Sequence, residues 1–516
     1  MRARRVLVAA TLAAATIGGC VLEAPAPRVR PTPTPVPPRE VTGTVVDRFS
    51  DAPVEGASLL VAGNADTVYT DADGAFRVFA VPGSAVEVNS PGYDPTTAEV
   101  PVDGSLDVAL RPNVVTGTVT DAQGDAVAGA RVFVDGTDNV AETADDGAYR
   151  IADVPPDAVL VYKAAGYALG ETAVEDATTS VLDVSLEPFA ARALYAPAAV
   201  FEAPGRLDAM LDLIERTEVN ALVIDVKETD GQLYYATELA TAVEVGAVRD
   251  QPIFDLEELL PMLRERGIYA IARMVVAKDN TLGAARPELA VDNVVTGGPW
   301  TDNLGGIWLD PFKPGVWEYV LSIATDLADK GFDEVQLDYV RFLSDGPFEQ
   351  ASLTLPDVQS NRLPAMRRLF RMAAEEFDHR RAFLAADIFP ISLILADDQG
   401  IGQREDVVMP YLDYVCPMLY PSHFGPGLFG YDVPNEAPYE VIDGSLEIIT
   451  ASADGLPVAI RPWIQDFGYG PFRAYTADDV RAEMQALYDN GVEGWMIWNP
   501  QSEFSEGALG PPPAGE

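Results

Sequence analysis

The chain has 516 residues, several times the usual size of one folded domain, so several folded units are expected. Its 80 acidic and 35 basic side chains give a formal net charge of -45. Such a negative surface repels phosphate backbones, which argues against nucleic acid as a partner. The two cysteines, Cys20 and Cys416, provide no disulfide framework, and the apolar surroundings of Cys416 predict a small buried side chain.

Residues 1–20 have the composition of a signal peptide. Three arginines precede an apolar stretch, Val6 to Ile17, that is too short to span a bilayer stably. The run that ends in Gly18, Gly19 and Cys20 resembles the lipobox of bacterial lipoproteins, in which the cysteine is acylated; a simply cleaved secretory signal is the alternative. We therefore predict an extracytoplasmic protein held to the cell membrane by a lipid on Cys20.

Residues 21–40 are predicted to form a proline-rich linker. Proline at this density favours an extended polyproline II conformation and cannot build a core. The segment would hold the rest of the chain away from the membrane.

A repeat with a period of about 74 residues follows the linker. VTGTVVD at Val41 recurs as VTGTVTD at Val115, and the PGY around Tyr93 recurs as AGY around Tyr167. Short alternating runs separated by Asp/Gly turns predict an antiparallel sandwich of about seven strands in each copy. The predicted modules cover residues 41–112 and 113–190.

The two copies resemble the carboxypeptidase regulatory-like family, whose T-D-x-x-G-x-[FY] pattern is matched at Thr70 and, less closely, at Thr143. That family shares its fold with starch-binding domains, so the resemblance implies contact with carbohydrate. Neither copy contains a tryptophan, which favours a role as a spacer. Both interpretations stay open.

Beyond about Arg192 the sequence pattern changes. All six tryptophans and both histidines lie here, and β-branched runs alternate with amphipathic stretches, several of which end at a glycine. An α/β architecture, the (β/α)8 TIM barrel, is predicted for residues 191–503, followed by a disordered tail at 504–516. A doubly wound open sheet is the alternative, but no glycine-rich phosphate loop supports it. The predicted strands begin at Ala193, Ala221, Tyr269, Glu334, Phe383, Tyr414, Val458 and Gly494.

Alternation along the strands predicts which side chains point into the barrel. One set of positions is largely apolar, as packing against helices requires, and includes Ile224, Leu337 and Ile464. The opposite set carries polar and charged groups towards the carboxyl ends of the strands, where barrel enzymes place their chemistry. That set comprises Asp225, Lys227, Arg273, Gln336, Asp338, Asp387, Arg461, Trp463 and Gln465.

Two carboxylates suit the cleavage of a glycosidic bond, because one protonates the leaving oxygen and the other attacks the anomeric carbon or activates water. Asp338 and Asp387, late on neighbouring strands, fit these catalytic roles. We predict that cations hold one of the acids ionised, and that aromatic side chains stack on sugar rings. The candidate substrate-binding residues are Asp225, Lys227, Glu228, Arg273, Arg341, Tyr420, His423, Arg461, Trp463 and Trp498. No metal-ligand spacing and no serine elbow is found, so no cofactor or metal is expected.

Several of these runs resemble a glycosyl hydrolase family known as a domain of unknown function. They are VNALVIDVKETDGQLYY, FDEVQLDYVRFLSDG and YVCPMLYPSHFGPG, which begin at Val219, Phe332 and Tyr414. The resemblance spans most of residues 192–503 and implies a barrel distantly similar to the α-amylase type, with Asp338 as nucleophile and Asp387 as acid. Amylase-type enzymes have a glutamate on strand five and an arginine at the position of Gln336, so the anomeric outcome stays open.

The sequence thus predicts a lipid-anchored glycoside hydrolase that acts on a polysaccharide outside the cytoplasmic membrane. A non-catalytic lipoprotein that binds glycan or cell wall is the first alternative. A scaffold for a protein partner is another, if the long segment between Lys278 and Trp308 fills the barrel mouth.

Overall fold

The computed structural model describes residues 36–174 and 181–512. The predicted signal peptide, Cys20 and most of the linker lie outside these residues. Contacts divide the chain into two compact units: the first holds the first β module, and the second holds the second β module together with the barrel. No helix in the described part is both long and apolar enough to cross a membrane.

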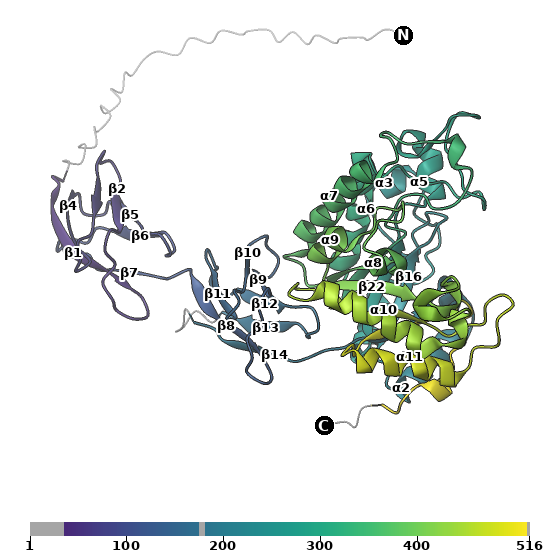
Figure 1. Ribbon diagram of the computed structural model, residues 1–516. Helices are drawn as coiled ribbons and strands as arrows, with labels where there is room; N and C mark the ends of the chain where they lie inside the picture. Colours follow the sequence, from purple (N-terminus) through teal and green to yellow (C-terminus); the bar gives the residue numbers. More distant parts are fainter. Residues whose placement is uncertain (1–35, 175–180, 513–516) are drawn as a thin grey trace, which may run out of the picture. The chain divides into compact units, whose positions relative to one another are not determined.

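The first module is a sandwich of two sheets with strand orders β4-β1-β7 and β3-β2-β5-β6 (Figure 1). Alternate residues such as Val86 and Val88 lie between the sheets and are fully buried. The strands are β1 (Arg39–Asp47), β2 (Ser58–Val61), β3 (Thr67–Tyr69), β4 (Ala75–Ala80), β5 (Ala85–Asn89), β6 (Thr96–Glu99) and β7 (Val108–Leu110).

The second module repeats this plan, with strand orders β11-β8-β14 and β10-β9-β12-β13. The predicted antiparallel arrangement is wrong for one pair, because β14 runs parallel to β8. The strands are β8 (Val115–Asp121), β9 (Arg131–Val134), β10 (Val140–Glu142), β11 (Ala148–Ile151), β12 (Val159–Lys163), β13 (Gly170–Ala173) and β14 (Val184–Leu186).

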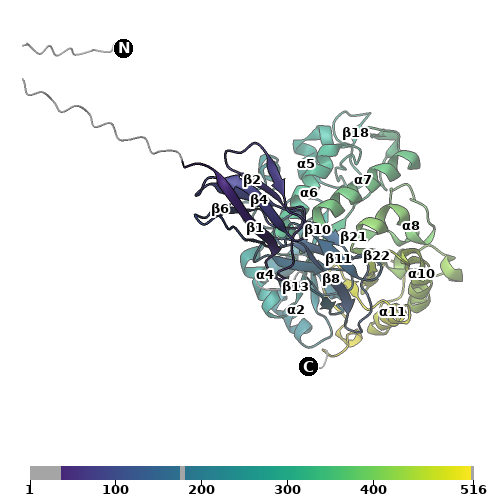
Figure 2. The same ribbon diagram turned by 90° about the vertical axis from the view of Figure 1, so that its left-hand side faces the viewer.

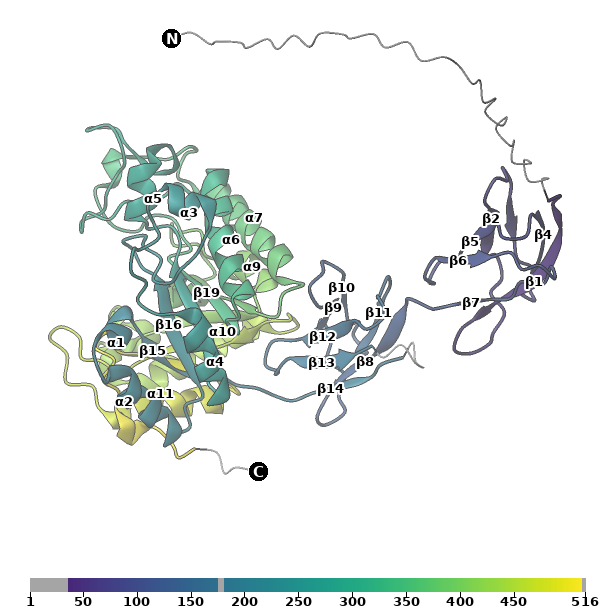
Figure 3. The ribbon, with the colours of Figure 1, turned by 180° about the vertical axis from the view of Figure 1, so that it is seen from behind.

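The third part is a closed parallel barrel of eight strands, as predicted (Figure 3). The sheet order is β21-β19-β17-β16-β15-β25-β24-β22, and pairing of β21 with β22 closes it. The seventh strand is interrupted and consists of β23 and β24. The strands are β15 (Arg192–Ala196), β16 (Ala221–Lys227), β17 (Tyr269–Val275), β19 (Glu334–Asp338), β21 (Phe383–Ile388), β22 (Tyr414–Leu419), β23 (Ala459–Ile460), β24 (Trp463–Gln465) and β25 (Trp495–Trp498).

Helices surround these strands (Figure 2). Several end as predicted: Gly267, Gly331 and Gly491 follow the last turns with positive φ, which glycine adopts without a Cβ penalty. The helices are α1 (Ala198–Glu202), α2 (Arg206–Glu215), α3 (Ala240–Glu244), α4 (Leu256–Glu265), α5 (Asn280–Ala285), α6 (Pro314–Asp329), α7 (Gln359–Phe377), α8 (Pro390–Ile394), α9 (Glu405–Val408), α10 (Pro438–Ala453) and α11 (Ala477–Asp489).

The barrel strands bury two separate apolar layers. Ile224, Leu337 and Ile464 pack in the large cluster that lies between strands and helices. Ile271 and Cys416 belong to a second cluster inside the barrel, where the Cys416 thiol is free and buried. The alternation read from the sequence therefore gives the correct face for these residues.

The second module covers the end of the barrel at which the strands begin, which we call the floor. The Gly166 amide donates to the Tyr414 hydroxyl at 3.1 Å, and Tyr414 is the first residue of β22. Arg131 forms ion pairs with Asp413 and, at 2.9 Å, with Asp378. The opposite end, where the strands finish, is the mouth.

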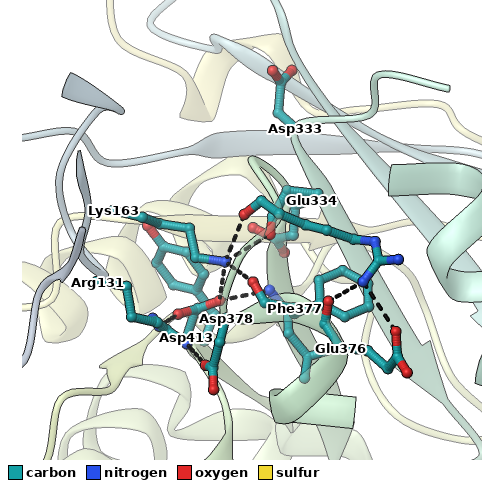
Figure 4. A network of polar contacts seen from close by, with 12 residues as sticks. Arg131, Lys163, Asp333, Glu334, Glu376, Phe377, Asp378 and Asp413 are labelled. Atoms are coloured by element: carbon teal, nitrogen blue, oxygen red, sulfur yellow. Dashed lines mark hydrogen bonds and ion pairs between the residues drawn. The ribbon is translucent and has the colours of Figure 1, made fainter. Parts of the chain in front are cut away.

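Lys163 anchors this contact from the end of β12 (Figure 4). Its ammonium group donates to the carbonyl oxygens of Phe377, Arg380 and Ala382 at 2.7, 3.1 and 2.9 Å, and lies 3.7 Å from an oxygen of Asp413. All three ammonium donors are thus satisfied although the side chain is fully buried. Burial lowers the pKa of Lys163 well below its usual value.

The segment expected as a disordered tail is ordered from residue 504 to 512. The backbone amide and hydroxyl of Ser505 donate to Asp466 at 2.7 and 2.8 Å. The Gly510 amide donates to Glu218 at 2.8 Å. The Asp466 carboxylate thus holds the C-terminal segment in place.

Candidate active site

The mouth is organised around Arg273, which stands near the end of β17. Its guanidinium group donates to Asp225 of β16, to Asp338 of β19 and, at 2.7 Å, to Glu228 beyond β16. Its Nε lies 3.7 Å from Asp387 Oδ2 at the end of β21. One cation therefore serves four carboxyl groups, which is too little charge to neutralise all of them.

Asp387 is the most deeply placed of the predicted catalytic pair. The indole Nε1 of Trp463 donates to its Oδ1 at 2.7 Å, and the side chain is 1% exposed. Burial first, and then the charge of Asp338, raise the pKa of Asp387 well above its usual value. A carboxyl group in this environment keeps its proton and can donate it.

Asp338 lies beside Asp387 but in different surroundings. Its Oδ2 accepts from Arg273, an ion pair that stabilises the charged carboxylate. Its Oδ1 accepts from the amide of Tyr339 at 2.6 Å. Tyr339 adopts φ +51°, a left-handed conformation that is costly for a tyrosine and is found most often at functional sites.

Tyr195 of β15 joins the cluster, although the sequence analysis did not single it out. Its hydroxyl donates to Asp225, and its ring stacks on Trp498 with centroids 4.0 Å apart. Burial raises the pKa of Asp225 to about 7 in spite of the nearby Arg273. The signal was available, because Tyr195 has the same parity as Ala193, which points into the barrel.

Two of the predicted cations lie elsewhere. A register shift between Asp225 and Lys227 turns the lysine away, and it pairs with Asp279 at 2.9 Å and donates to the Val275 carbonyl at 2.7 Å. Arg461 lies at the floor, where it pairs with Glu334, the first residue of β19. Neither supplies charge to the catalytic pair.

The residues after β22 lie at the edge of the cluster. Burial, followed by the charges of Asp387 and Asp338, raises the pKa of Tyr420, so this side chain lies within reach of both acids. His423 bonds Ser422 Oγ at 2.9 Å, and its ring lies 4.5 Å from that of Tyr469. Burial lowers the pKa of His423, which favours the neutral imidazole.

The long segment between Lys278 and Trp308 is folded. Lys278 pairs with Asp302 at 2.6 Å, and the Trp308 indole donates to the same carboxylate at 3.0 Å. Within it, β18 (Asp292–Asn293) pairs with β20 (Ala351–Ser352), which ties the loops after β17 and β19 together. The segment thus forms part of the wall near the mouth.

The fold and the carboxyl cluster are those of a barrel with its polar site at the carboxyl ends of the strands. A family described as "Putative glycosyl hydrolase domain" matches residues 193–504. Because this match takes more than half of the chain, the chain belongs to that family. The Carboxypeptidase regulatory-like domain matches residues 40–111 and 114–187, so the two modules are repeats of that domain. Both resemblances noted in the sequence are confirmed.

Solved structures with similar parts are known. A hypothetical protein from Ruminiclostridium thermocellum ATCC 27405 is 32% identical, with a TM-score of 0.34, over 38% of this chain and 96% of its own. The PgaB (BpsB) glycoside hydrolase domain from Bordetella bronchiseptica is 12% identical, with a TM-score of 0.45, over 62% of this chain and 99% of its own. The beta-amylase catalytic domain from Paenibacillus polymyxa is 12% identical, with a TM-score of 0.40, over 63% and 95%. No curated protein matches the chain. The family assignment rests on the sequence match.

Proposed function

We propose that the barrel is a glycoside hydrolase that cleaves O-glycosidic bonds of a polysaccharide. Asp387 is the general acid that protonates the leaving oxygen. Asp338 is the nucleophile that attacks the anomeric carbon, or the base that activates a water molecule for the same attack. Both outcomes use the same two side chains and differ in the configuration of the product.

The observation that carries the proposal is the contrast between these two carboxyl groups. Asp387 is buried against Trp463 with a raised pKa, while Asp338 is paired with Arg273. A buried carboxyl group with a raised pKa suits a general acid, and a neighbouring carboxyl group in an ion pair suits a nucleophile or base. Tyr195, Trp463 and Trp498 supply rings on which a sugar can stack.

A second candidate, a glycan-binding protein without turnover, is favoured by one observation. Asp338 is 6% exposed and Asp387 is 1% exposed, so neither acid presents much surface to a ligand. In this alternative Arg273 holds the carboxylates in a structural cluster, and the aromatic side chains alone bind sugar. Measurement of turnover decides between the two.

We also propose that the enzyme works outside the cytoplasmic membrane, held by a lipid on Cys20. The support is the sequence of residues 1–20, which has the charge, apolar length and terminal cysteine of a lipoprotein signal. Labelling with a fatty-acid analogue, compared between the natural chain and Cys20→Ser, tests this part alone. Equal labelling of both chains would contradict it.

The decisive experiment is a screen of residues 40–516 against bacterial and plant polysaccharides, with release of reducing ends as the readout. Asp338→Asn and Asp387→Asn are measured beside the parent, and Asp212→Asn, on the exposed face of α2, is the matched control. Proton NMR of the first product gives its anomeric configuration.

We expect product from the parent and from Asp212→Asn, and at least a hundredfold less from either site variant. Circular dichroism checks that both site variants are folded. Glycan binding by every variant with turnover by none would transfer the assignment to the binding protein.

A further inference from the structure

Arg341 is a buried cation at the mouth that forms no ion pair with the described residues. It follows β19 by three residues, is 6% exposed, and donates to Ser344 Oγ. Among residues 36–174 and 181–512, no carboxylate oxygen lies within 4.0 Å of its guanidinium nitrogens. Asp338, Asp345 and Asp302 attract this charge from beyond ion-pair distance, and Asp302 pairs with Lys278 instead. The guanidinium group is therefore buried without a carboxylate of the described chain in direct contact.

Every other buried lysine or arginine in the described part of the chain has an acidic partner. These pairs lie in the second module, at the floor, at the mouth and among the outer helices. The paired residues are Arg111, Lys163, Lys227, Arg273, Lys278, Arg362 and Arg461. Burial of a cation without an ion pair costs roughly several kcal/mol of folding free energy. Arg341 is therefore an exception that needs a cause.

Three aromatic rings surround this side chain. The guanidinium carbon lies 5.0 Å from the ring centroid of Trp308, 4.9 Å from that of Tyr339 and 4.7 Å from that of Phe389. Cation–π contacts of this kind offset part of the lost hydration. They accept none of the five N–H hydrogens in the guanidinium plane, and burial still lowers the pKa of Arg341.

We propose that Arg341 binds a carboxylate group of the substrate, so that the glycan is an acidic polysaccharide containing uronic acid units. This inference rests on the proposed hydrolase and names its substrate class. A planar guanidinium group binds a carboxylate through two parallel hydrogen bonds, and the aromatic rings hold the guanidinium plane in place. Asp338 accepts from the Tyr339 amide at 2.6 Å, and the Tyr339 ring contacts Arg341, so a uronate bound here would lie on the same side of the mouth as the acids.

The overall charge of the protein opposes the approach of an acidic ligand, so a local cation would have to outweigh it. At -45, the surface repels a polyanion at long range, and salt at about 0.1 M screens this repulsion beyond about 10 Å. A buried guanidinium group is screened much less, and so it can select a carboxylate at short range. A neutral glycan would need no such cation.

The test uses the full chain and sugars that it cannot cleave, so that binding is measured without turnover. Galacturonate is compared with its methyl ester, which removes the charge and adds a methyl group, and with galactose 6-sulfate, by ligand-observed NMR at fixed salt. The variants are Arg341→Gln, which removes the charge, and Arg341→Lys, which keeps the charge but loses the planar fork. Arg371→Gln, an exposed position on α7, is the matched control.

We expect galacturonate to bind at least tenfold more tightly than its ester, and Arg341→Gln to lose at least tenfold in affinity. Arg341→Lys should fall between the parent and Arg341→Gln, and Arg371→Gln should equal the parent. Equal binding of acid and ester, tighter binding of the sulfate, or full affinity in a folded Arg341→Gln chain would each overturn the inference.

The same preparation is screened for turnover, which separates this inference from the proposed function. Cleavage of neutral glycans without binding of galacturonate refutes the acidic substrate and leaves the hydrolase in place. Galacturonate binding that depends on Arg341 without any turnover supports the subsite and removes the hydrolase. If the protein neither binds galacturonate nor cleaves any glycan, both the acidic substrate and the hydrolase are refuted.

Discussion

The two ends of the barrel treat charge in opposite ways. At the floor, Arg461 pairs with Glu334. The Lys163 ammonium group donates to three carbonyl oxygens beside Asp413. At the mouth, Arg273 is shared by four carboxyl groups, while Arg341 has no acidic partner among the described residues. The paired cations and acids at the floor are equal in number, whereas the acids at the mouth outnumber Arg273.

This difference separates groups that stabilise the fold from groups that carry chemistry. Charges that are balanced in number can remain fixed. A buried cluster with an excess of acids contains carboxyl groups with raised pKa values, here Asp225 and Asp387, which can exchange protons. Changes at the floor should therefore reduce stability and preserve turnover. Changes at the mouth should reduce turnover and have a smaller effect on stability.

The largest effect is expected from Asp387→Asn at the mouth. The substitution keeps an acceptor for Trp463 but removes the proton donor, so kcat on a natural glycan should fall about 10²- to 10⁴-fold. An aryl glycoside with an acidic leaving group needs little protonation and should lose far less. Steady-state kinetics on both substrates checks this, and equal losses would assign Asp387 another role.

A change at the floor tests the other half of the comparison. Lys163→Met should lower the free energy of unfolding by about 3–5 kcal/mol, because it leaves three carbonyls and Asp413 without their shared donor. The matched control is Asn89→Met, at the equivalent exposed position of the first repeat, with an expected change within about 0.5 kcal/mol. Urea titration gives both values. Lower turnover per folded molecule in Lys163→Met would contradict the separation of the two ends.

A smaller effect should appear in the pH dependence of stability. The Asp225 carboxyl group keeps its proton up to a pH of about 7 in the folded chain, because burial raises its pKa from 3.8 to about 7. Between these values only the unfolded chain loses that proton, so stability falls as pH rises, by up to about 1.4 kcal/mol per pH unit. Asp225→Asn should show a shallower slope. Thermal unfolding at pH 4 to 8 measures it, and identical slopes would mean that Asp225 is charged throughout.

Much of the mouth could be predicted from alternation along the strands. Asp225, Arg273, Asp338 and Asp387 share the inward parity, and the structure does bring them together. Parity says which face a side chain occupies but not its height along the barrel. Arg461 therefore has the right parity and lies at the wrong end, beside Glu334.

The positions of Lys227 and Arg341 depend on irregular backbone and on tertiary contacts, which regular alternation does not predict. The register shift after Asp225, a β-bulge, directs Lys227 to Asp279. No residue type in that strand predicts this bulge. The lack of an ion pair at Arg341 among the described residues follows from the tertiary structure around it. Sequence spacing placed it near the acids but could not reveal the three rings around it.

The docking of the second module could have been found by comparing the repeats. Leu60, Glu87 and Asn89 are exposed on one face of the first module. Their equivalents in the second module are Phe133, Val161 and Lys163, and all three are fully buried against the barrel or the module core. That sheet face of the second module is closed to glycan, whereas the first module leaves its own open.

The location of the floor contact affects how a polymer can reach the acids at the mouth. The chain enters the barrel from the second module, at the end where the strands begin, and the carboxyl cluster opens at the other end. The second module is therefore joined to the barrel at the end remote from the acids. A polymer can reach the acids at the mouth without displacing this module.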